Sequence, residues 1–279
     1  MRNARPVDRF IDKVAVVTGG ASGIGRALCE ELARRKALVV VADISEEDAR
    51  EVASTIIRHG GRAEAARLDV ARPDEVQDLI ARTVSQHGHL DFMFNNAGIG
   101  VVGEVRDLQL EHWHKIIDVN LWGVIYGTSA AYAVMIKQGF GHIVNTASLS
   151  GLIGCPTLAS YTTTKMAVVG LSTSLRVEAA DLGVKVSVVC PGYVQTAIFR
   201  KATYLNVRRE YVLARLPFKK IAAEEAARLT VRGIERNRAI IVFPLYARFL
   251  WWLNRLHVGL GSSLGRRALK DFRAARIKS

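Results

Sequence analysis

Short runs rich in Val, Ile and Leu alternate along this chain with longer amphipathic segments. Strands are predicted at seven such runs, residues 14–17, 38–42, 63–68, 92–94, 142–146, 184–189 and 240–243. Their continuous apolar character is typical of parallel strands buried on both faces. Helices are predicted between them, at residues 24–36, 46–59, 74–87, 111–137, 160–181 and 223–235. This alternation predicts right-handed βαβ units and therefore an α/β fold with a doubly wound parallel sheet.

Small or polar residues follow the predicted strands directly. They are Gly19, Asp43, Asp69, Asn96, Ser148 and Pro191. Because ligands of doubly wound sheets bind outside the carboxyl ends of the strands, these residues should converge on one site.

A glycine cluster, residues 18–25, joins the first predicted strand to the first predicted helix. Gly19, Gly23 and Gly25 would let the backbone approach a pyrophosphate closely, and the helix N-terminus offers unpaired N–H groups. The spacing is longer than that of the general Gly-x-Gly-x-x-Gly fingerprint. The cluster by itself therefore indicates a tight turn that is suited to a dinucleotide.

Tyr161 and Lys165 stand four residues apart on a predicted helix and so project from one face. An ammonium beside a phenol favours the phenolate, which would lower the tyrosine pKa toward neutrality. Ser148, thirteen residues before Tyr161, supplies a hydroxyl that can hold a substrate oxygen. With the glycine cluster, these residues predict hydride transfer coupled to proton transfer.

The chain resembles the short-chain dehydrogenase/reductase family from about Lys13 to about Thr196. The motifs are Thr18-Gly19-x-x-x-Gly23-x-Gly25, Asn95-Asn96-Ala97-Gly98, Asn120, Ser148, Tyr161-x-x-x-Lys165 and Pro191-Gly192. The resemblance implies a Rossmann-type fold, a nicotinamide cofactor and four catalytic residues, Asn120, Ser148, Tyr161 and Lys165. It assigns Asn120 to holding a water that links Lys165 to solvent. The alternative is a helix-interior asparagine that satisfies backbone groups.

The resemblance also implies the cofactor-binding residues. They are Gly19, Ser22, Gly23, Ile24, Gly25, Asp43, Asp69, Val70, Asn96, Tyr161, Lys165, Val194 and Thr196. A carboxylate at Asp43 would accept hydrogen bonds from a ribose diol and repel a 2′-phosphate. Ser22 stands where relatives that use NADP often carry a basic residue. Both features favour NAD over NADP, and no metal site is expected.

The implied activity is interconversion of a secondary alcohol and a ketone, or of a primary alcohol and an aldehyde. Apolar residues near the catalytic positions, and a segment at residues 193–220 that covers the pocket, favour a lipophilic substrate. Basic residues of that segment would either meet an anionic group or only solvate it. The alternative function is a non-catalytic dinucleotide sensor or scaffold on the same fold.

The formal net charge of +13 lies entirely in the C-terminal part, since residues 198–279 hold 19 Lys and Arg against 5 Asp and Glu. We expect a catalytic domain at residues 1–245 and a basic helical extension at residues 246–279. One face of that extension carries Phe249, Trp252, Leu253, Leu256 and Leu260. Two interpretations stay open. The face packs on the protein or on a partner subunit, or it lies on an anionic membrane surface.

The remaining expectations concern the cellular setting. Three widely spaced cysteines and a polar N-terminus favour a reducing compartment, so a cytoplasmic enzyme is expected, with peripheral membrane association as an option. The resemblance implies a homo-oligomer, either a dimer or a tetramer. The basic tail has no nucleic-acid recognition motif, so no nucleic-acid partner is expected.

Overall fold

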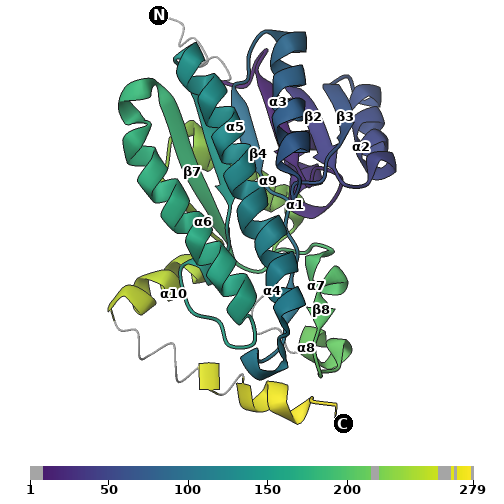
Figure 1. Cartoon of the computed structure of the whole chain (residues 1–279), viewed down its shortest axis with the longest axis vertical. Coiled ribbons are helices and arrows are strands. Elements are labelled where there is room, and N and C mark those ends of the chain that lie inside the picture. The colour runs from purple at the N-terminus through teal and green to yellow at the C-terminus, as the bar shows by residue number, and fades with distance from the viewer. Residues whose placement is uncertain (1–8, 215–219, 257–264, 267–268, 278–279) are drawn as a thin grey trace, which may run out of the picture.

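A seven-stranded parallel sheet in the order β3-β2-β1-β4-β6-β7-β9 forms the centre of the molecule (Figure 1). The structure is a computed structural model that describes residues 9–214, 220–256, 265–266 and 269–277. The strands are β1 (Val14–Thr18), β2 (Leu38–Asp43), β3 (Arg62–Arg67), β4 (Phe92–Asn95), β6 (Gly141–Thr146), β7 (Val184–Pro191) and β9 (Ile240–Phe243). The predicted doubly wound α/β fold is therefore confirmed, and each predicted strand lies within one residue or two of an observed one.

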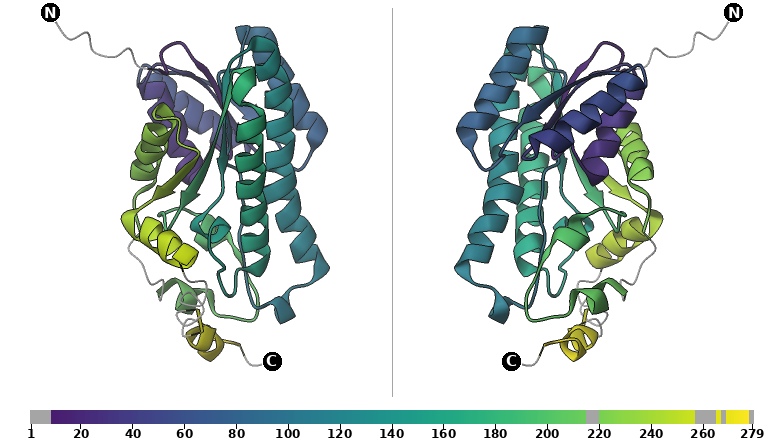
Figure 2. Two further views of the ribbon diagram at one scale, coloured as in Figure 1. Left: turned by 90° about the vertical axis from the view of Figure 1, so that its left-hand side faces the viewer. Right: turned by 90° about the vertical axis from the view of Figure 1, so that its right-hand side faces the viewer.

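Helices cover both faces of the sheet (Figure 2). One face packs against α1 (Gly23–Arg34), α2 (Glu46–Arg58) and α9 (Ala223–Glu235). The other packs against α3 (Pro73–His87), α5 (Gly123–Gln138) and α6 (Ala159–Glu178). With apolar layers on both faces, all five residues of β1 are buried, as its unbroken apolar sequence predicts.

The long predicted helix at residues 111–137 is interrupted. It consists of α4 (Leu110–Ile117), a π-helical turn at Asp118–Trp122 and α5. By length and composition alone, Leu110–Gln138 is apolar enough to cross a membrane. Here its buried side packs on β4 and β6, which is what an apolar core helix does.

A second, two-stranded sheet was not predicted. It pairs β5 (Val101–Val102) with β8 (Thr203–Tyr204). The segment after β7 also contains two short helices, α7 (Ile198–Lys201) and α8 (Arg209–Ala214). The sheet ties this segment, predicted to cover the substrate, to the chain that leaves β4.

The C-terminal extension begins with α10 (Leu245–Leu256). Its buried side carries Ala247, with Tyr246, Leu250 and Trp251 packed on the same apolar cluster. The predicted apolar face is the opposite one: Phe249, Trp252 and Leu256 are 58%, 57% and 64% exposed. The interpretation that this face packs on the chain itself is therefore wrong for those three residues, because α10 turns its other side inward. Leu253 is partly buried, and Leu260 lies outside the described residues.

Candidate active site

The predicted site residues meet at the carboxyl edge of the sheet, where β1 lies next to β4. The chain runs outward from β1 to β2 and β3, and then returns to β4 on the other side of β1. A crevice at such a switch point is where doubly wound sheets bind ligands. The glycine turn follows β1, Asn96 follows β4, and Ser148 follows β6.

The glycine turn is closed so tightly that side chains do not fit. Gly19 and Gly23 have φ of 63° and 54°, which disfavours residues with a Cβ. A Cβ at Gly25 would lie 2.0 Å from the Gly19 carbonyl oxygen. Asn96 holds the turn against β4, because its Nδ2 donates to the Thr18 carbonyl at 3.1 Å.

The N-terminus of α1 fits an anionic group. Its first turn contains no acidic residue, and its N-cap Ser22 makes no side-chain capping hydrogen bond within the described part of the chain. The backbone N–H groups of the first turn, including that of Ile24, are therefore available to an anionic ligand at the positive end of the helix dipole. A dinucleotide pyrophosphate has the charge and the size that this cradle requires.

Asp43 ends β2 beside the glycine turn. Its carboxylate accepts from the backbone N–H of Ala21 at 3.1 Å and from that of Ser45 at 3.2 Å. Arg26, the nearest arginine in the turn, is engaged on the helix surface by Glu30 at 3.0 Å and by Glu51 at 3.6 Å. The position beside the turn thus presents a carboxylate, with the local arginine already paired.

Residues from two further loops, one after β7 and one after β3, were predicted to border the same crevice. A Cβ on Gly23 would lie 3.0 Å from Thr196 Cγ2, so the segment after β7 lies against the glycine turn. Val194 is buried in the core cluster of that face. Asp69 accepts from the Ala71 N–H at 3.0 Å, and the buried Val70 packs where a Cβ on Gly123 would lie. The side chains of Val70 and Val194 are therefore largely committed to packing.

Tyr161 and Lys165 project from α6 toward Ser148, at the end of β6. The Lys165 Nζ lies 5.6 Å from the centre of the Tyr161 ring. Burial raises the pKa of Tyr161 to about 12, and a hydrogen bond with the Ser148 hydroxyl opposes that rise. Burial also lowers the pKa of the Lys165 ammonium to about 8. The predicted lowering of the Tyr161 pKa is therefore not present in this structure, because removal from water outweighs the hydrogen bond with Ser148.

Asn120 occupies the π-helical turn and is fully buried. Its Oδ1 accepts from the Ile99 N–H at 2.8 Å, and its Nδ2 donates to the Ile99 carbonyl at 2.9 Å. The side chain satisfies backbone groups, as the alternative interpretation stated. This pair of bonds fixes the backbone of Ile99, in the segment between β4 and β5.

Three residues organise the site in ways that the sequence did not reveal, although one of them, Thr18, is part of the glycine motif. Thr18 Oγ1 accepts from the N–H groups of Asn96 and Ala97 at 3.0 and 3.1 Å. The Thr146 carbonyl accepts from Lys165 Nζ at 2.8 Å. Tyr246 Oη accepts from the Tyr193 N–H at 2.6 Å. The role of Thr18 could have been inferred from the glycine motif. The hydrogen bond between Tyr193 and Tyr246 joins residues 53 positions apart and leaves no local signal in the sequence.

The apolar residues expected near the catalytic centre are buried or partly buried, most of them in two apolar clusters. Val101, Val102 and Leu149 are buried, and Leu152, Ile153 and Leu158 are partly buried in the adjoining clusters. The basic side chains of the covering segment that the structure describes are instead exposed. They are Arg200, Lys201, Arg208, Arg209 and Lys220. The interpretation in which they face solvent fits these positions.

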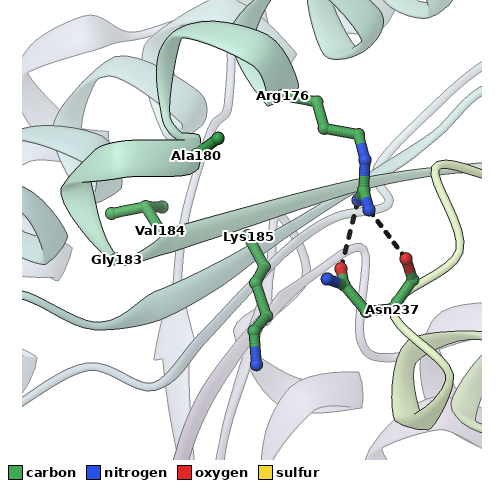
Figure 3. A pocket seen from close by; sticks show the side chains of 6 residues that line it. All are labelled: Arg176, Ala180, Gly183, Val184, Lys185 and Asn237. Atoms are coloured by element: carbon green, nitrogen blue, oxygen red, sulfur yellow. Dashed lines mark hydrogen bonds between the residues drawn. The ribbon is translucent and has the colours of Figure 1, made fainter.

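A surface recess lies at the opposite end of the sheet, where β7 begins (Figure 3). There the Arg176 guanidinium donates to the side-chain and backbone oxygens of Asn237 at 3.1 and 2.8 Å. These bonds tie α6 to the turn before β9. The recess lies at the end of the sheet opposite the carboxyl edge, and none of its lining residues is a predicted site residue.

Comparisons with known proteins agree with this geometry. The sequence profile of the short chain dehydrogenase family matches residues 13–204. The chain is 37% identical over 210 residues to a cyclohexanol dehydrogenase of Acinetobacter sp. (strain SE19), covering 75% of this chain and 84% of that protein. It is 34% identical over 200 residues to 3beta-hydroxysteroid dehydrogenase 2 of Eggerthella lenta, covering 71% of this chain and 77% of that protein.

A solved structure shares the fold. A short chain dehydrogenase/reductase from Burkholderia phymatum, crystallised in complex with NAD, superposes with a TM-score of 0.83. It is 29% identical, and the match covers 90% of this chain and 96% of that chain.

Proposed function

The chain belongs to the short-chain dehydrogenase/reductase family, and we propose that it is an NAD-preferring enzyme that interconverts a lipophilic alcohol and its carbonyl compound. The alcohol is secondary, giving a ketone, or primary, giving an aldehyde. The observation that carries the proposal is the meeting of Ser148, Tyr161 and Lys165 beside a glycine turn shaped for a dinucleotide. An oxidoreductase of this family needs such a proton relay next to its cofactor.

The chain's own groups handle the substrate oxygen and its proton. The Ser148 hydroxyl holds the oxygen. In oxidation the Tyr161 phenolate takes the alcohol proton and becomes a phenol, and in reduction the phenol returns that proton. Because burial by itself raises the pKa of Tyr161, the phenolate depends on the positive charges of Lys165 and of a bound oxidised nicotinamide ring. Lys165 supplies the neighbouring positive charge. Lys165 is buried, and Ser148 and Tyr161 are partly buried, which limits the access of water and favours proton transfer between the substrate and Tyr161. The side chain of Asn120 is committed to Ile99, so a water-holding role would fall to its backbone carbonyl.

The cofactor would be held by the residues of the crevice. The turn at Gly19, Ser22, Gly23, Ile24 and Gly25 would take the pyrophosphate at the α1 N-terminus, and Asp43 the adenosine ribose hydroxyls. The remaining contacts would come from Asp69, Val70, Asn96, Tyr161, Lys165, Val194 and Thr196. When bound, nicotinamide dinucleotide supplies the hydride acceptor for the alcohol carbon.

The preference for NAD rests on charge. A 2′-phosphate beside Asp43 would meet a carboxylate that the Ala21 and Ser45 amides hold in place. Arg26, which could otherwise neutralise it, is paired with two glutamates. The ratio of kcat/KM for NAD⁺ and NADP⁺ tests this, and a wild type that prefers NADP⁺ would contradict it.

The proposed lipophilic substrate class is supported by apolar residues near the catalytic segment: Val102 and Leu158 share one apolar cluster, and Leu149, directly after Ser148, belongs to another. Cyclic and steroidal alcohols, the substrates named for two relatives, are the first compounds to test. NADH formation across a panel of such alcohols tests the proposal. A protein that binds NADH but turns over none of them would favour the alternative, a dinucleotide sensor or scaffold.

We also propose that two copies pair through the outer faces of α4, α5 and α6. Apolar residues on these helices are exposed in the single chain, among them Leu110, Trp122, Met166 and Val177. The stacked pair of Trp122 and Tyr126, with ring centres 5.6 Å apart, makes a flat apolar surface there. Light scattering of wild type and of Trp122→Glu tests the pairing.

The exposed face of α10 suits an anionic membrane surface. Leu245, Phe249, Trp252 and Leu256 form an apolar stripe, and Arg248 and Arg255 are exposed beside it. The helix has no acidic residue. Such a stripe with flanking arginines binds at the interface of anionic lipid bilayers. This contact would bring a lipophilic substrate to the enzyme.

A further inference from the structure

The last described segment of the chain, residues 269–277, lies across the part of the molecule that covers the substrate crevice. We call it the C-terminal strap; residues 269–274 of it are helical. In Figure 1 it is the lowest helix, next to α8. Residues 203–212, which include β8 and the start of α8, are called the substrate loop here.

Two buried carboxylates receive the arginines of the strap. Glu104 Oε1 accepts from Arg273 Nε at 3.0 Å and Nη2 at 2.7 Å, and its Oε2 accepts from Arg276 Nη1 at 3.0 Å. Asp107 accepts from both Nη atoms of Arg276, at 2.6 and 2.9 Å. The Glu104 and Asp107 side chains are only 10% and 5% exposed. Bidentate pairs with carboxylates this sheltered are geometrically specific, unlike most surface ion pairs.

The same arginine network includes the substrate loop. Asn206 Nδ2 donates to Asp107 Oδ1 at 2.9 Å. The backbone of the strap pairs with the loop as well, because the Ile277 N–H donates to the Asn206 carbonyl at 3.1 Å and the Arg208 N–H to the Ala275 carbonyl at 3.4 Å. The strap therefore pairs with the substrate loop through backbone hydrogen bonds on both sides of an antiparallel bridge between Val207 and Arg276.

An apolar cluster lies under these polar contacts. Phe272 and Ala275 of the strap are buried with Val102 of β5 and Val207 of the substrate loop. Leu158, three residues before Tyr161, packs against the same cluster. The strap thus contacts the substrate loop, β5 and the catalytic segment together.

We propose that the C-terminal strap is a specificity-determining element, which holds the substrate loop over the crevice and so sets the affinity for the alcohol. The claim about affinity rests on the proposed function, whereas the claim that the strap orders the loop does not. Arg273 and Arg276 of the basic extension are engaged by acidic residues of the catalytic domain.

The experiment compares Arg273→Gln/Arg276→Gln with a matched control, Arg266→Gln/Lys270→Gln. Both double variants lose two positive charges from the C-terminal segment, and the control side chains are exposed. Hydrogen exchange of the free protein is measured first. Amides of residues 203–212, and above all that of Arg208, should exchange at least about tenfold faster in the strap variant. Amides of β1 should be unchanged in both variants, which shows that the domain stays folded.

Steady-state kinetics follow with whichever alcohol the wild type oxidises. The strap variant should raise KM for the alcohol about tenfold, while kcat and KM for NAD⁺ stay within about twofold of wild type. General destabilisation of the enzyme would not raise KM for the alcohol while leaving KM for NAD⁺ unchanged. Adding Asp107→Asn to Arg276→Gln should have little further effect, because the two residues share one interaction.

The outcomes separate the two claims. Unchanged hydrogen exchange of the substrate loop in Arg273→Gln/Arg276→Gln would overturn the claim that the strap orders this loop. An equal acceleration of exchange in Arg266→Gln/Lys270→Gln would also overturn it. Faster exchange with an unchanged KM for the alcohol would overturn its role in specificity. If the wild type oxidises no alcohol while the exchange result holds, the proposed function fails and the ordering of the loop by the strap stands.

Discussion

Lys165 donates its ammonium proton to the main-chain carbonyl of Thr146, with 2.8 Å between the two atoms. The bond joins the catalytic helix α6 to the end of β6 and holds the ammonium between the Tyr161 ring and the segment after β4. A Cβ added to Gly98 would lie 3.6 Å from the Nζ, which is an ordinary contact distance, so the Gly98 segment lies directly beside the ammonium. Lys165 is thereby a buried charge in a fixed position.

Lys165→Met should make the protein more stable and less active. Burial lowers the pKa of Lys165 to about 8, from an ordinary value of 10.5, so folding disfavours its charged form. Stability of the wild type should therefore rise with pH between about 8 and 10.5, where the unfolded chain holds a proton that the folded chain has lost. At pH 7 we expect a gain of roughly 1–3 kcal/mol in the variant, measured by urea unfolding, together with lower kcat and weaker NAD⁺ binding. Unchanged affinity for NAD⁺ in the variant would show that Lys165 does not contribute to binding of the cofactor.

Tyr161→Phe removes the proton carrier and keeps the ring. Turnover should fall by at least about 100-fold, while binding of NADH, followed by fluorescence, survives. Tyr132→Phe removes the same hydroxyl from a tyrosine of α5 outside the site and serves as the control. Wild-type turnover in Tyr161→Phe would contradict the proposed mechanism.

Asp43→Ala should relax or reverse the preference for NAD⁺. The change removes the carboxylate that would repel a 2′-phosphate, and leaves the Ala21 N–H free to donate to it. The measurement is the ratio of kcat/KM values for NAD⁺ and NADP⁺ in wild type and variant. Glu47→Ala, an exposed carboxylate at the start of α2, provides a control for lost negative charge.

His142→Gln should flatten the acid side of the stability profile. His142 is buried on β6, with its Nε2 2.9 Å from Ser187 Oγ, and burial lowers its pKa to about 3 from an ordinary 6.5. As the pH falls below 6.5, His142 is protonated in the unfolded chain but stays neutral in the folded chain. The free energy of unfolding therefore decreases as the pH is lowered from 6.5 to about 3. This decrease in the free energy of unfolding approaches roughly 1.4 kcal/mol per pH unit, and it should be missing in the variant because Gln does not titrate. Equal unfolding profiles of wild type and variant between pH 7 and about 5 would refute this.

The exposed face of α10 should bind anionic vesicles. Co-sedimentation with vesicles that contain phosphatidylserine should exceed that with neutral vesicles, weaken with salt, and be lost in Phe249→Ser/Trp252→Ser. Phe140→Ser, an exposed aromatic that precedes β6 at the other end of the sheet, is the control. Equal and negligible binding to both kinds of vesicle at low salt contradicts the membrane role. A molecular mass that halves in the double variant would instead assign the face to a second copy of the chain.

The fold could be predicted from the sequence because its causes are local. Unbroken apolar runs such as Val14–Thr18 are stable only as buried parallel strands, and the steric limits at Gly19 and Gly25 hold for any chain that makes that turn. The order of strand and helix then places Ser148 and the glycine turn at one edge of the sheet, since every crossover has the same hand.

Contacts between distant segments decided what remained, and sequence patterns do not encode them. The periodicity of α10 indicates an apolar stripe around Phe249, but only packing shows that the Ala247 side turns inward. The pKa of Tyr161 depends on how much water the surrounding loops exclude, which no spacing reveals. Asp107 and Arg276 are 169 positions apart, and their pairing exists only because folding brings the C-terminus over β5. Short-range sterics and periodicity are properties of the chain itself, whereas burial and long-range ion pairs arise only once the chain has folded.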